Sequence, residues 1–396
     1  MAHETELTEA DERQILDAIG KWIEKKVAPV AMQLEHDNEW PADLVNDMAG
    51  LGLFGALIHP DYGGLGLSAS TYSKIVTMIS QEWMSLTGIF NSHLMMATVV
   101  QKFGTPKQKE YWLPRFATGE LRGGLGLTEP DAGTDLQAIR TQARRKGDRY
   151  VVNGTKTWIS NAIEGHCVAL LVKTDPDAEP RYKGMSILIT SKVDPVTGKA
   201  LPGIRNGKKL EKLGYKGIDS GEFIFDDYEC DAELSLVGGV EGQGFFMATG
   251  GLEIGRINIA ARSVGIARRA LSESVRYSQI RRTMGKPICE HQAIQLKLGE
   301  MAAKTRAAEL LVEDAARAYD RGERIDMEAG MAKYFASETA VEVALEAMRI
   351  HGGYGYSREY VIERLYRDAP LMCIGEGTNE MQRIIIARQL IKRNPA

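Results

Sequence analysis

Residues 294–319 read IQLKLGEMAAKTRAAELLVEDAARAY, and this stretch decides which kind of fold the chain forms. Its apolar positions recur in alternating steps of four and three, a period near 3.5 that is typical of helices packed almost antiparallel in a bundle. These positions are Ile294, Leu298, Met301, Thr305, Ala308, Val312, Ala315 and Tyr319. The pattern predicts a helix that ends before Gly322.

Two other segments in the C-terminal half of the sequence show the same helical period. Apolar residues line one face from Ile257 to Leu271 and again from Ala329 to Ile350, after which a glycine pair ends the pattern. A shorter helix is predicted from Met381 to Lys392. Residues 238–396 are therefore expected to form a C-terminal four-helix bundle.

The middle of the sequence, residues 123–237, has a different residue pattern. Short runs rich in β-branched and aromatic residues alternate with clusters of Gly, Pro, Asp and Asn, a pattern typical of strands joined by turns. These runs are Tyr150–Val152, Val168–Val172, Met185–Ile189 and Glu222–Phe225. We expect a central β-domain that is barrel-like or a β-sandwich.

The first third of the sequence again carries helical signals. Thr105 and Gln108 have the spacing of a capping box, with Pro106 at the first helical position between them. A chain of 396 residues is expected to divide, because a single core rarely exceeds about 250–300 residues. We expect an α+β multidomain protein that is mainly α, with an N-terminal helical domain. The predicted domains are 1–122, 123–237 and 238–396.

The composition excludes several functional classes. Lys plus Arg total 49 against 53 for Asp plus Glu, so the chain lacks the basic excess that binds nucleic acid. No apolar run reaches the 18 or so residues that span a bilayer, and the acidic N-terminus lacks a signal-peptide core. The four cysteines form no CxxC pair, so no metal site is expected. We expect a cytoplasmic bacterial protein or, if processed, one of the mitochondrial matrix.

Three segments carry residue types suited to a cofactor. Residues 127–135, LTEPDAGTD, offer hydroxyls and backbone N–H groups to a ring edge or a phosphate, or form an ordinary turn. In KTWISN (156–161), Trp158 lies between hydroxyls, either against a flat ligand or buried in the core. Residues 281–286, RRTMGK, place cations and a hydroxyl between two helices, which suits a pyrophosphate or a solvated surface.

Glu376 is the most informative single residue. It lies in CIGEGTNE (373–380), between two glycines and before the last helix. The glycines allow a ligand to approach the backbone closely. Apolar residues precede it, and burial would raise the pKa of its carboxyl toward the range of a general base. The alternative is a glutamate that only complements a helix N-terminus.

Together and in this order, these segments resemble the acyl-CoA dehydrogenase family over essentially the whole chain. The matching segments are LTEPDAGTD, KTWISN, GRINIAARSVGIA, RRTMGKPI, EHQAIQ, HGGYGY, YRDA and IGEGTNE. The resemblance implies FAD as cofactor and a homotetramer that is a dimer of dimers. It also implies dehydrogenation of an acyl-CoA to the trans-2-enoyl-CoA, with electrons passing to an electron-transfer flavoprotein.

The resemblance also assigns roles to residues. Glu376 is expected to abstract the α-proton while flavin N5 accepts the β-hydrogen as hydride, and its backbone N–H and a ribityl hydroxyl are expected to bind the thioester oxygen. Arg281, Thr283 and Gln292 are expected to reach FAD from a neighbouring subunit, and Arg349 stands where glutamine is usual. The expected FAD contacts are Leu127, Thr128, Thr134, Trp158, Ser160, Arg281, Thr283, Gln292, Arg349, Gly352, Gly353, Thr378 and Glu380. The expected substrate contacts are Thr134, Glu253, Arg256 and Gly377.

Other functions and the acyl group stay open. The same fold serves acyl-CoA oxidases, nitroalkane-type oxidases and enoyl-CoA reductases, and a non-catalytic helical assembly protein is a further alternative. Glutaryl-type relatives carry an arginine in the helix matching residues 84–90; none is present here, so a distal carboxylate is not expected to bind in that manner. Candidates for the acyl pocket, or for a buried helix face, are Trp83, Met84, Leu86, Met95 and Met96.

Overall fold

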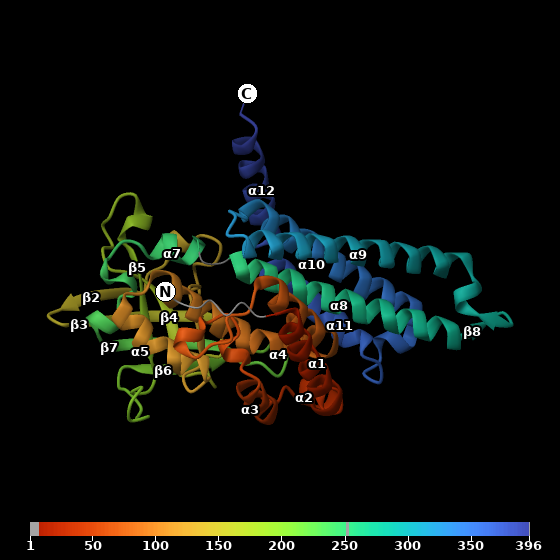
Figure 1. Ribbon diagram of the computed structural model, residues 1–396, viewed down its shortest axis with the longest axis horizontal. Helices are drawn as coiled ribbons and strands as arrows, with labels where there is room; N and C mark the ends of the chain where they lie inside the picture. The colour runs from red at the N-terminus through yellow and green to blue at the C-terminus, as the bar shows by residue number, and fades with distance from the viewer. Residues whose placement is uncertain (1–7, 251–252, 396) are drawn as a thin grey trace.

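The computed structural model describes residues 8–250 and 253–395, with helical regions before and after a β-sheet region in the sequence (Figure 1). The N-terminal helices are α1 (Glu9–Trp22), α2 (Ala31–Asp37), α3 (Ala42–Gly50), α4 (Ala69–Phe103) and α5 (Pro106–Ala117). The predicted capping box opens α5, because the side chains of Thr105 and Gln108 each accept the other's backbone N–H.

The longest helix, α4, forms the centre of the molecule. It has apolar residues on all sides and is buried along most of its length, as expected for a helix with neighbours all around. Its backbone leaves the helical conformation at Trp83, where φ is −156° and ψ is 102°. The helix packs against the sheet at one end and against the C-terminal helices along its side.

The central region is a β-sheet region, as predicted; it is one curled, mainly antiparallel sheet. Its strands are β1 (Gly123–Gly126), β2 (Gln142–Lys146), β3 (Arg149–Ser160), β4 (Cys167–Lys173), β5 (Met185–Ser191), β6 (Ile204–Lys209) and β7 (Ser220–Asp231). Their order is β1-β4-β2-β3-β7-β6, with β5 also paired to β4. Nearly every residue of β4 is buried, so this strand lies in the core of the curled sheet.

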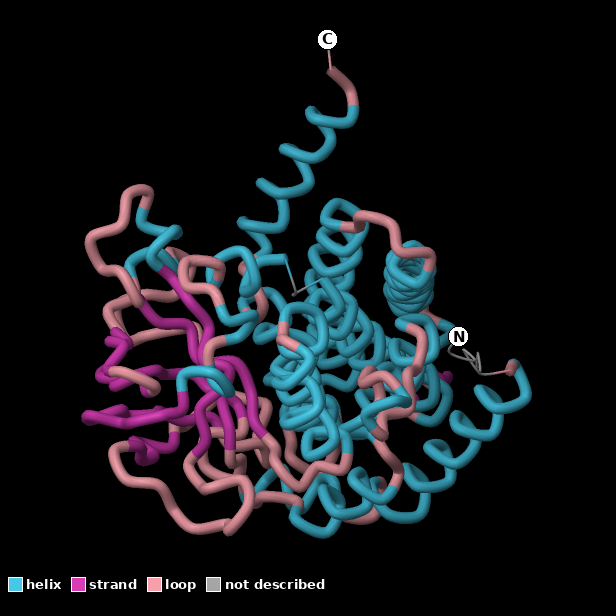
Figure 2. The backbone as a smooth tube through the Cα atoms, turned by 60° about the vertical axis from the view of Figure 1, so that its left-hand side comes forward, coloured by secondary structure: helices cyan, strands magenta, loops and turns pink. Residues whose placement is uncertain are grey.

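The sheet and the long helices occupy opposite sides of the molecule (Figure 2). Short helices α6 (Ala232–Ser235) and α7 (Gly244–Gly250) follow the sheet. The later helices are α8 (Glu253–Ile280), α9 (Gln292–Asp320), α10 (Asp326–His351), α11 (Ile362–Ile374) and α12 (Asn379–Arg393). A small hairpin of β8 (Arg282–Thr283) and β9 (Lys286–Pro287) joins α8 to α9.

The C-terminal helices α8, α9 and α10 confirm the predicted apolar faces, but the fourth neighbour differs from the prediction. Helix α12 forms where it was expected, yet beyond its first turns it projects from the body of the molecule (Figures 1 and 2). The helix that packs along α8 and α10 is α11, which the sequence analysis missed. Pro370 lies inside α11, and a proline there makes a helical pattern look interrupted.

No helix within the described ranges is both long and apolar enough to cross a lipid bilayer. This agrees with the absence of a long apolar run in the sequence.

Candidate active site

Glu376 lies in the short loop between α11 and α12. Its φ is +53°, a left-handed conformation that is unfavourable for a residue with a side chain, and Gly377 follows at φ +84°. The Thr378 side chain caps the next helix by accepting the Met381 N–H. Such a backbone persists only where the surroundings hold it. Gln382 of α12, itself buried, donates to the Gly377 carbonyl at 3.1 Å, and a second buried side chain holds the loop from α10.

That side chain is Lys333 of α10, which is fully buried. Its Nζ donates to the carbonyl oxygens of Cys373 and Gly377, at 3.1 and 3.0 Å, and to Asn379 Oδ1 at 2.7 Å. Burial lowers the pKa of Lys333 to about 8. The sequence analysis missed Lys333, although a lysine four residues after Ala329 on an otherwise apolar face was a visible signal.

The Glu376 carboxylate has one oxygen engaged and one free. Asn91 Nδ2 donates to Oε1 at 2.9 Å. Asn91 Oδ1 in turn accepts from the Tyr72 hydroxyl, and that hydroxyl accepts from Asn258 Nδ2 at 2.8 Å. The other oxygen, Oε2, is buried and has no hydrogen-bond partner among the described residues. It lies against Gly255 of α8, where an added Cβ would come within 1.9 Å of it.

The surroundings of Glu376 set its proton affinity. Burial raises the pKa of the Glu376 carboxyl, while the Arg262 charge and the Asn91 hydrogen bond oppose the rise. An oriented carboxylate with a raised pKa and a free oxygen suits proton abstraction. Asn91, Arg262 and Lys333 had not been singled out from the sequence, because they meet Glu376 only in three dimensions.

The expected flavin residues lie at the edge of the sheet. Leu127 and Thr128 follow β1, and the Thr128 carbonyl accepts the Thr157 N–H of β3 at 2.9 Å. Lys156, fully buried, donates to the Leu127 carbonyl and to Glu129, which fixes the loop.

The indole of Trp158 lies beside this loop at the end of β3. It is 60% exposed and has φ +60°, so it is not the core residue given as the alternative from the sequence. Ser160, two residues later, lies in contact with Tyr215. Thr134 is exposed in the loop after β1. An uncovered indole beside free loop hydroxyls fits a flat, polar-edged ring such as a flavin.

The expected pyrophosphate residues lie elsewhere. Arg281 and Thr283 line a pocket of about 820 Å³ together with Gly352 and Gly353, and Gln292 begins α9 nearby. Helix α8 has 28 residues, so at about 1.5 Å per residue its two ends are about 42 Å apart. Its first turn touches Glu376, and its last residue, Ile280, precedes Arg281 and the small hairpin of β8 and β9 (Figure 1). One chain therefore does not bring its pyrophosphate residues to its own Glu376.

Of the remaining expected contacts, Arg349 lies towards the Arg281 pocket, and Glu380 and Gly377 lie at the Glu376 loop. Arg349 is exposed and pairs with Glu346 of its own helix. Glu380 is exposed beside the Glu376 loop and pairs with Arg383 at 2.9 Å. Gly377 gives its carbonyl to Lys333, as described above.

The first turn of α8 holds the other expected substrate residues. Glu253 is partly buried, which raises the pKa of its carboxyl. Arg256 is only 7% exposed, its guanidinium reaches no closer than 4.0 Å to Asp326, and its Nε and Nη1 have no hydrogen-bond partner among the described residues. Met95 lies beside Gly255 at this site, whereas Trp83 packs against Gly217 away from it.

Sequence comparisons identify the chain. The family descriptions "Acyl-CoA dehydrogenase, N-terminal domain", "middle domain" and "C-terminal domain" match residues 9–120, 124–228 and 242–391. The chain belongs to the acyl-CoA dehydrogenase family. Members of this family are FAD-dependent flavoprotein oxidoreductases that act on acyl-CoA, which confirms the expected fold, enzyme class and cofactor.

Individual relatives match over almost their whole length. A 3-(aryl)acrylate reductase of Clostridium sporogenes is 38% identical, with 94% of this chain and 96% of that protein covered. An acyl-CoA dehydrogenase of Bacillus subtilis is 39% identical, with coverages of 93% and 94%. The structure of butyryl-CoA dehydrogenase from Megasphaera elsdenii superposes with a TM-score of 0.91 at 34% identity, over 98% of this chain and 100% of that one.

Proposed function

We propose that this member of the family oxidises an acyl-CoA thioester to the trans-2-enoyl-CoA, with Glu376 as the general base. The observation that supports this role is the free, buried Oε2 of Glu376, held beside Gly255 with its pKa raised. Loss of the α-proton builds negative charge on the thioester oxygen, which the site has to stabilise. We assign that task to the Glu376 backbone N–H, which the left-handed turn between two glycines leaves accessible.

The residues of this chain hold FAD in two half-sites. Leu127, Thr128, Trp158 and Ser160 would hold the flavin ring near Glu376, and bound FAD supplies a hydride acceptor there. Arg281, Thr283 and Gln292 would hold the pyrophosphate and adenosine of FAD in another copy of the chain. We therefore propose a homotetramer built as a dimer of dimers, with electrons passing to an electron-transfer flavoprotein.

A second candidate function is the reverse reaction, reduction of an enoyl thioester. One relative with 38% identity is named a 3-(aryl)acrylate reductase, and the same base and cofactor serve both directions. Glu376 would then deliver the proton to the α-carbon.

The test is anaerobic titration of the FAD-loaded protein with butyryl-CoA, followed by its reoxidation. We expect the flavin absorbance to bleach while crotonyl-CoA forms, and an electron-transfer flavoprotein to restore the absorbance. Rapid peroxide formation in air would instead assign an oxidase. A protein that takes up no FAD would contradict the proposal.

A further inference from the structure

A second arginine of α8, Arg262, is buried close to Glu376 without an anionic partner. It is 3% exposed. Its Nη1 donates to the Tyr215 hydroxyl at 3.1 Å, and its Nη2 donates to the Thr87 carbonyl at 3.2 Å. Its Nε has no hydrogen-bond partner within the described part of the chain, and no carboxylate there lies within 4.0 Å of it.

A buried guanidinium without an anionic partner destabilises the fold unless a bound anion pairs with it. A buried cation loses its hydration, and two neutral oxygens replace only part of that loss. Unsatisfied buried donors in a folded protein therefore point to a ligand or a water that occupies the site. A guanidinium binds a carboxylate best through two parallel N–H groups, and here the Nε edge is free.

The position of Arg262 ties it to the reacting centre. Among the charges acting on Glu376, Arg262 has the largest effect in opposing the rise of its pKa. The contacts between α4 and α8 place it there as well. Thr87, whose carbonyl accepts from Arg262, lies one helical turn before Asn91, which donates to Glu376 Oε1, so Arg262 lies about one turn from the base along the interface of the two helices.

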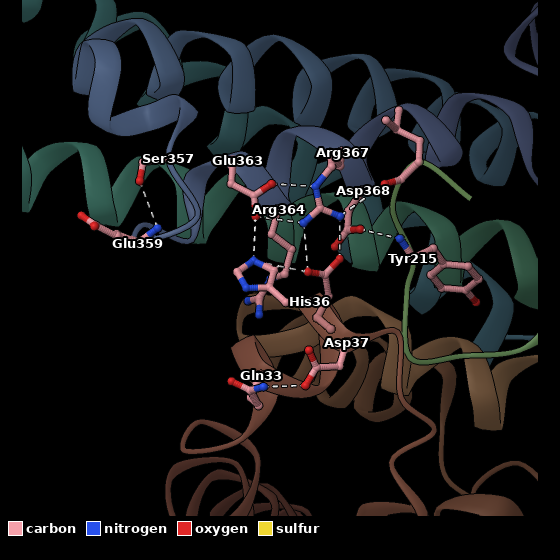
Figure 3. Close-up of polar contacts among 12 residues, drawn as sticks. Gln33, His36, Asp37, Tyr215, Ser357, Glu359, Glu363, Arg364, Arg367 and Asp368 are labelled. Carbon is pink, nitrogen blue, oxygen red and sulfur yellow. Dashed lines mark hydrogen bonds and ion pairs between the residues drawn. The ribbon is translucent and has the colours of Figure 1, made fainter. Parts of the chain in front are cut away.

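Tyr215 is held rigidly beside this arginine. Its backbone N–H donates to Asp368 Oδ1 of α11 at 2.6 Å, in a cluster where Arg367 also pairs with Glu35 and Glu363 (Figure 3). On its other side, the Tyr215 hydroxyl lies against Gly88 of α4, where an added Cβ would come within 1.6 Å of it. The hydroxyl is therefore fixed as a second polar group beside Arg262.

We propose that Arg262, with Tyr215, binds a terminal carboxylate of the acyl group, so that this enzyme takes CoA monothioesters of short dicarboxylic acids. This inference rests on the proposed function. No arginine lies in residues 84–90, so a carboxylate is not bound from that helix; Arg262 instead reaches across from α8 to the Thr87 carbonyl.

The experiment compares three thioesters on the FAD-loaded enzyme: glutaryl-CoA, its monomethyl ester and butyryl-CoA. We expect wild type to prefer glutaryl-CoA to the methyl ester by more than tenfold in kcat/KM of flavin reduction. Arg262→Gln should lower kcat/KM for glutaryl-CoA about 100-fold, as expected when one partner of a buried charge pair is removed. At a pH well above the pKa of Glu376, the same variant should lower the value for butyryl-CoA much less than the value for glutaryl-CoA. Tyr215→Phe should weaken the preference to a smaller degree.

A binding measurement supports the kinetic one. In the Glu376→Gln holoenzyme, calorimetry should show tighter binding of glutaryl-CoA than of the methyl ester, and adding Arg262→Gln should remove the difference. If Arg262→Gln does not fold, Arg262→Lys and Tyr215→Phe take its place.

Other outcomes separate the possible failures. Equal use of glutaryl-CoA and its methyl ester by wild type would overturn the inference. So would an equal loss for all three thioesters in Arg262→Gln, which would make Arg262 a positioning residue for Glu376. Wild type that bleaches with none of the thioesters would contradict the proposed function itself.

Discussion

At the first turn of α8, Glu376 lies among side chains that the same chain already holds in place, whereas at the last turn Arg281 and Thr283 are exposed. Asn91 and Lys333 fix the Glu376 loop through buried hydrogen bonds. Near Arg281 large apolar side chains are exposed among the charged ones: Ile280, Met284, Leu296 and Tyr356. Exposed apolar groups in such numbers are typical of a surface that another molecule covers. The residues around Glu376 are thus preorganised within one chain, and the exposed surface at the other end supports our proposal that a second chain completes the cofactor site there.

The largest effect is expected from a change beside Glu376, at the first turn of α8. Gly255→Ala places a methyl group where Glu376 Oε2 now lies, so the carboxylate has to turn away. Because a side-chain end can move at little cost, we expect kcat/KM to fall at least 100-fold while the melting temperature stays nearly unchanged. Gly299→Ala in α9 is the matched control, since no atom of the described residues lies within 4 Å of its added Cβ. Full activity in Gly255→Ala would contradict the placement of Glu376.

A second change at this end affects stability. Lys333→Met leaves the Cys373 carbonyl without its side-chain donor, and leaves the Gly377 carbonyl and Asn379 Oδ1 with only Gln382 and Ser337, so we expect the free energy of unfolding to fall by about 2 kcal/mol. Chemical denaturation measures the loss. Lys392→Met, at an exposed position of α12, should change stability by less than about 0.5 kcal/mol. Equal stability of the two variants would show that Lys333 does not hold the loop.

A smaller effect is expected at the other end. Arg281→Gln removes a charge-assisted contact to the pyrophosphate, so FAD should bind about tenfold more weakly. Fluorescence titration of the apoprotein with FAD measures this. Unfolding and refolding Arg281→Gln together with Glu376→Gln should produce mixed oligomers with some restored activity, because some sites then combine an intact Glu376 with an intact Arg281. The assay uses an FAD concentration that leaves Arg281→Gln largely without cofactor. Mixtures no more active than the average of the two separate variants would argue against sites shared between chains.

The smallest expected effect concerns the pH dependence of the reaction. A general base works only when deprotonated, so kcat/KM should fall as the pH drops through the raised pKa of Glu376. Arg262→Gln removes the cation that opposes this rise, so the acid limb of the profile should move to higher pH. An unchanged limb in that variant would place Arg262 too far from the base to act on it.

Patterns confined to neighbouring residues made most of the fold predictable. The period of residues 294–319 identified α9, and the Thr105–Gln108 capping box placed the start of α5. Pro370 hid α11, since a proline within a helix imitates a helix end. No local pattern showed that α12 leaves the bundle, because a helix that projects has the same period as one that packs.

The site was predictable only where a motif carries it. Glu376 and the loop around Trp158 have distinctive neighbours in sequence, but the exposure of Trp158 depends on what packs above β3. Asn91 is 285 residues from the carboxylate it bonds, and Arg262 reads as an ordinary charge in an apolar helix. Their roles arise from the packing of α4 against α8, which the sequence periodicity does not specify.

The most direct test of the role of Glu376 is flavin reduction in Glu376→Gln, compared with Glu110→Gln at an exposed position of α5. Both variants should bind FAD, because a glutamine at 376 can still accept from Asn91 and Glu110 lies on the surface. On anaerobic rapid mixing with an acyl-CoA that wild type oxidises, Glu110→Gln should bleach at close to the wild-type rate and Glu376→Gln should stay yellow. Fast bleaching in Glu376→Gln would contradict its assignment as the base.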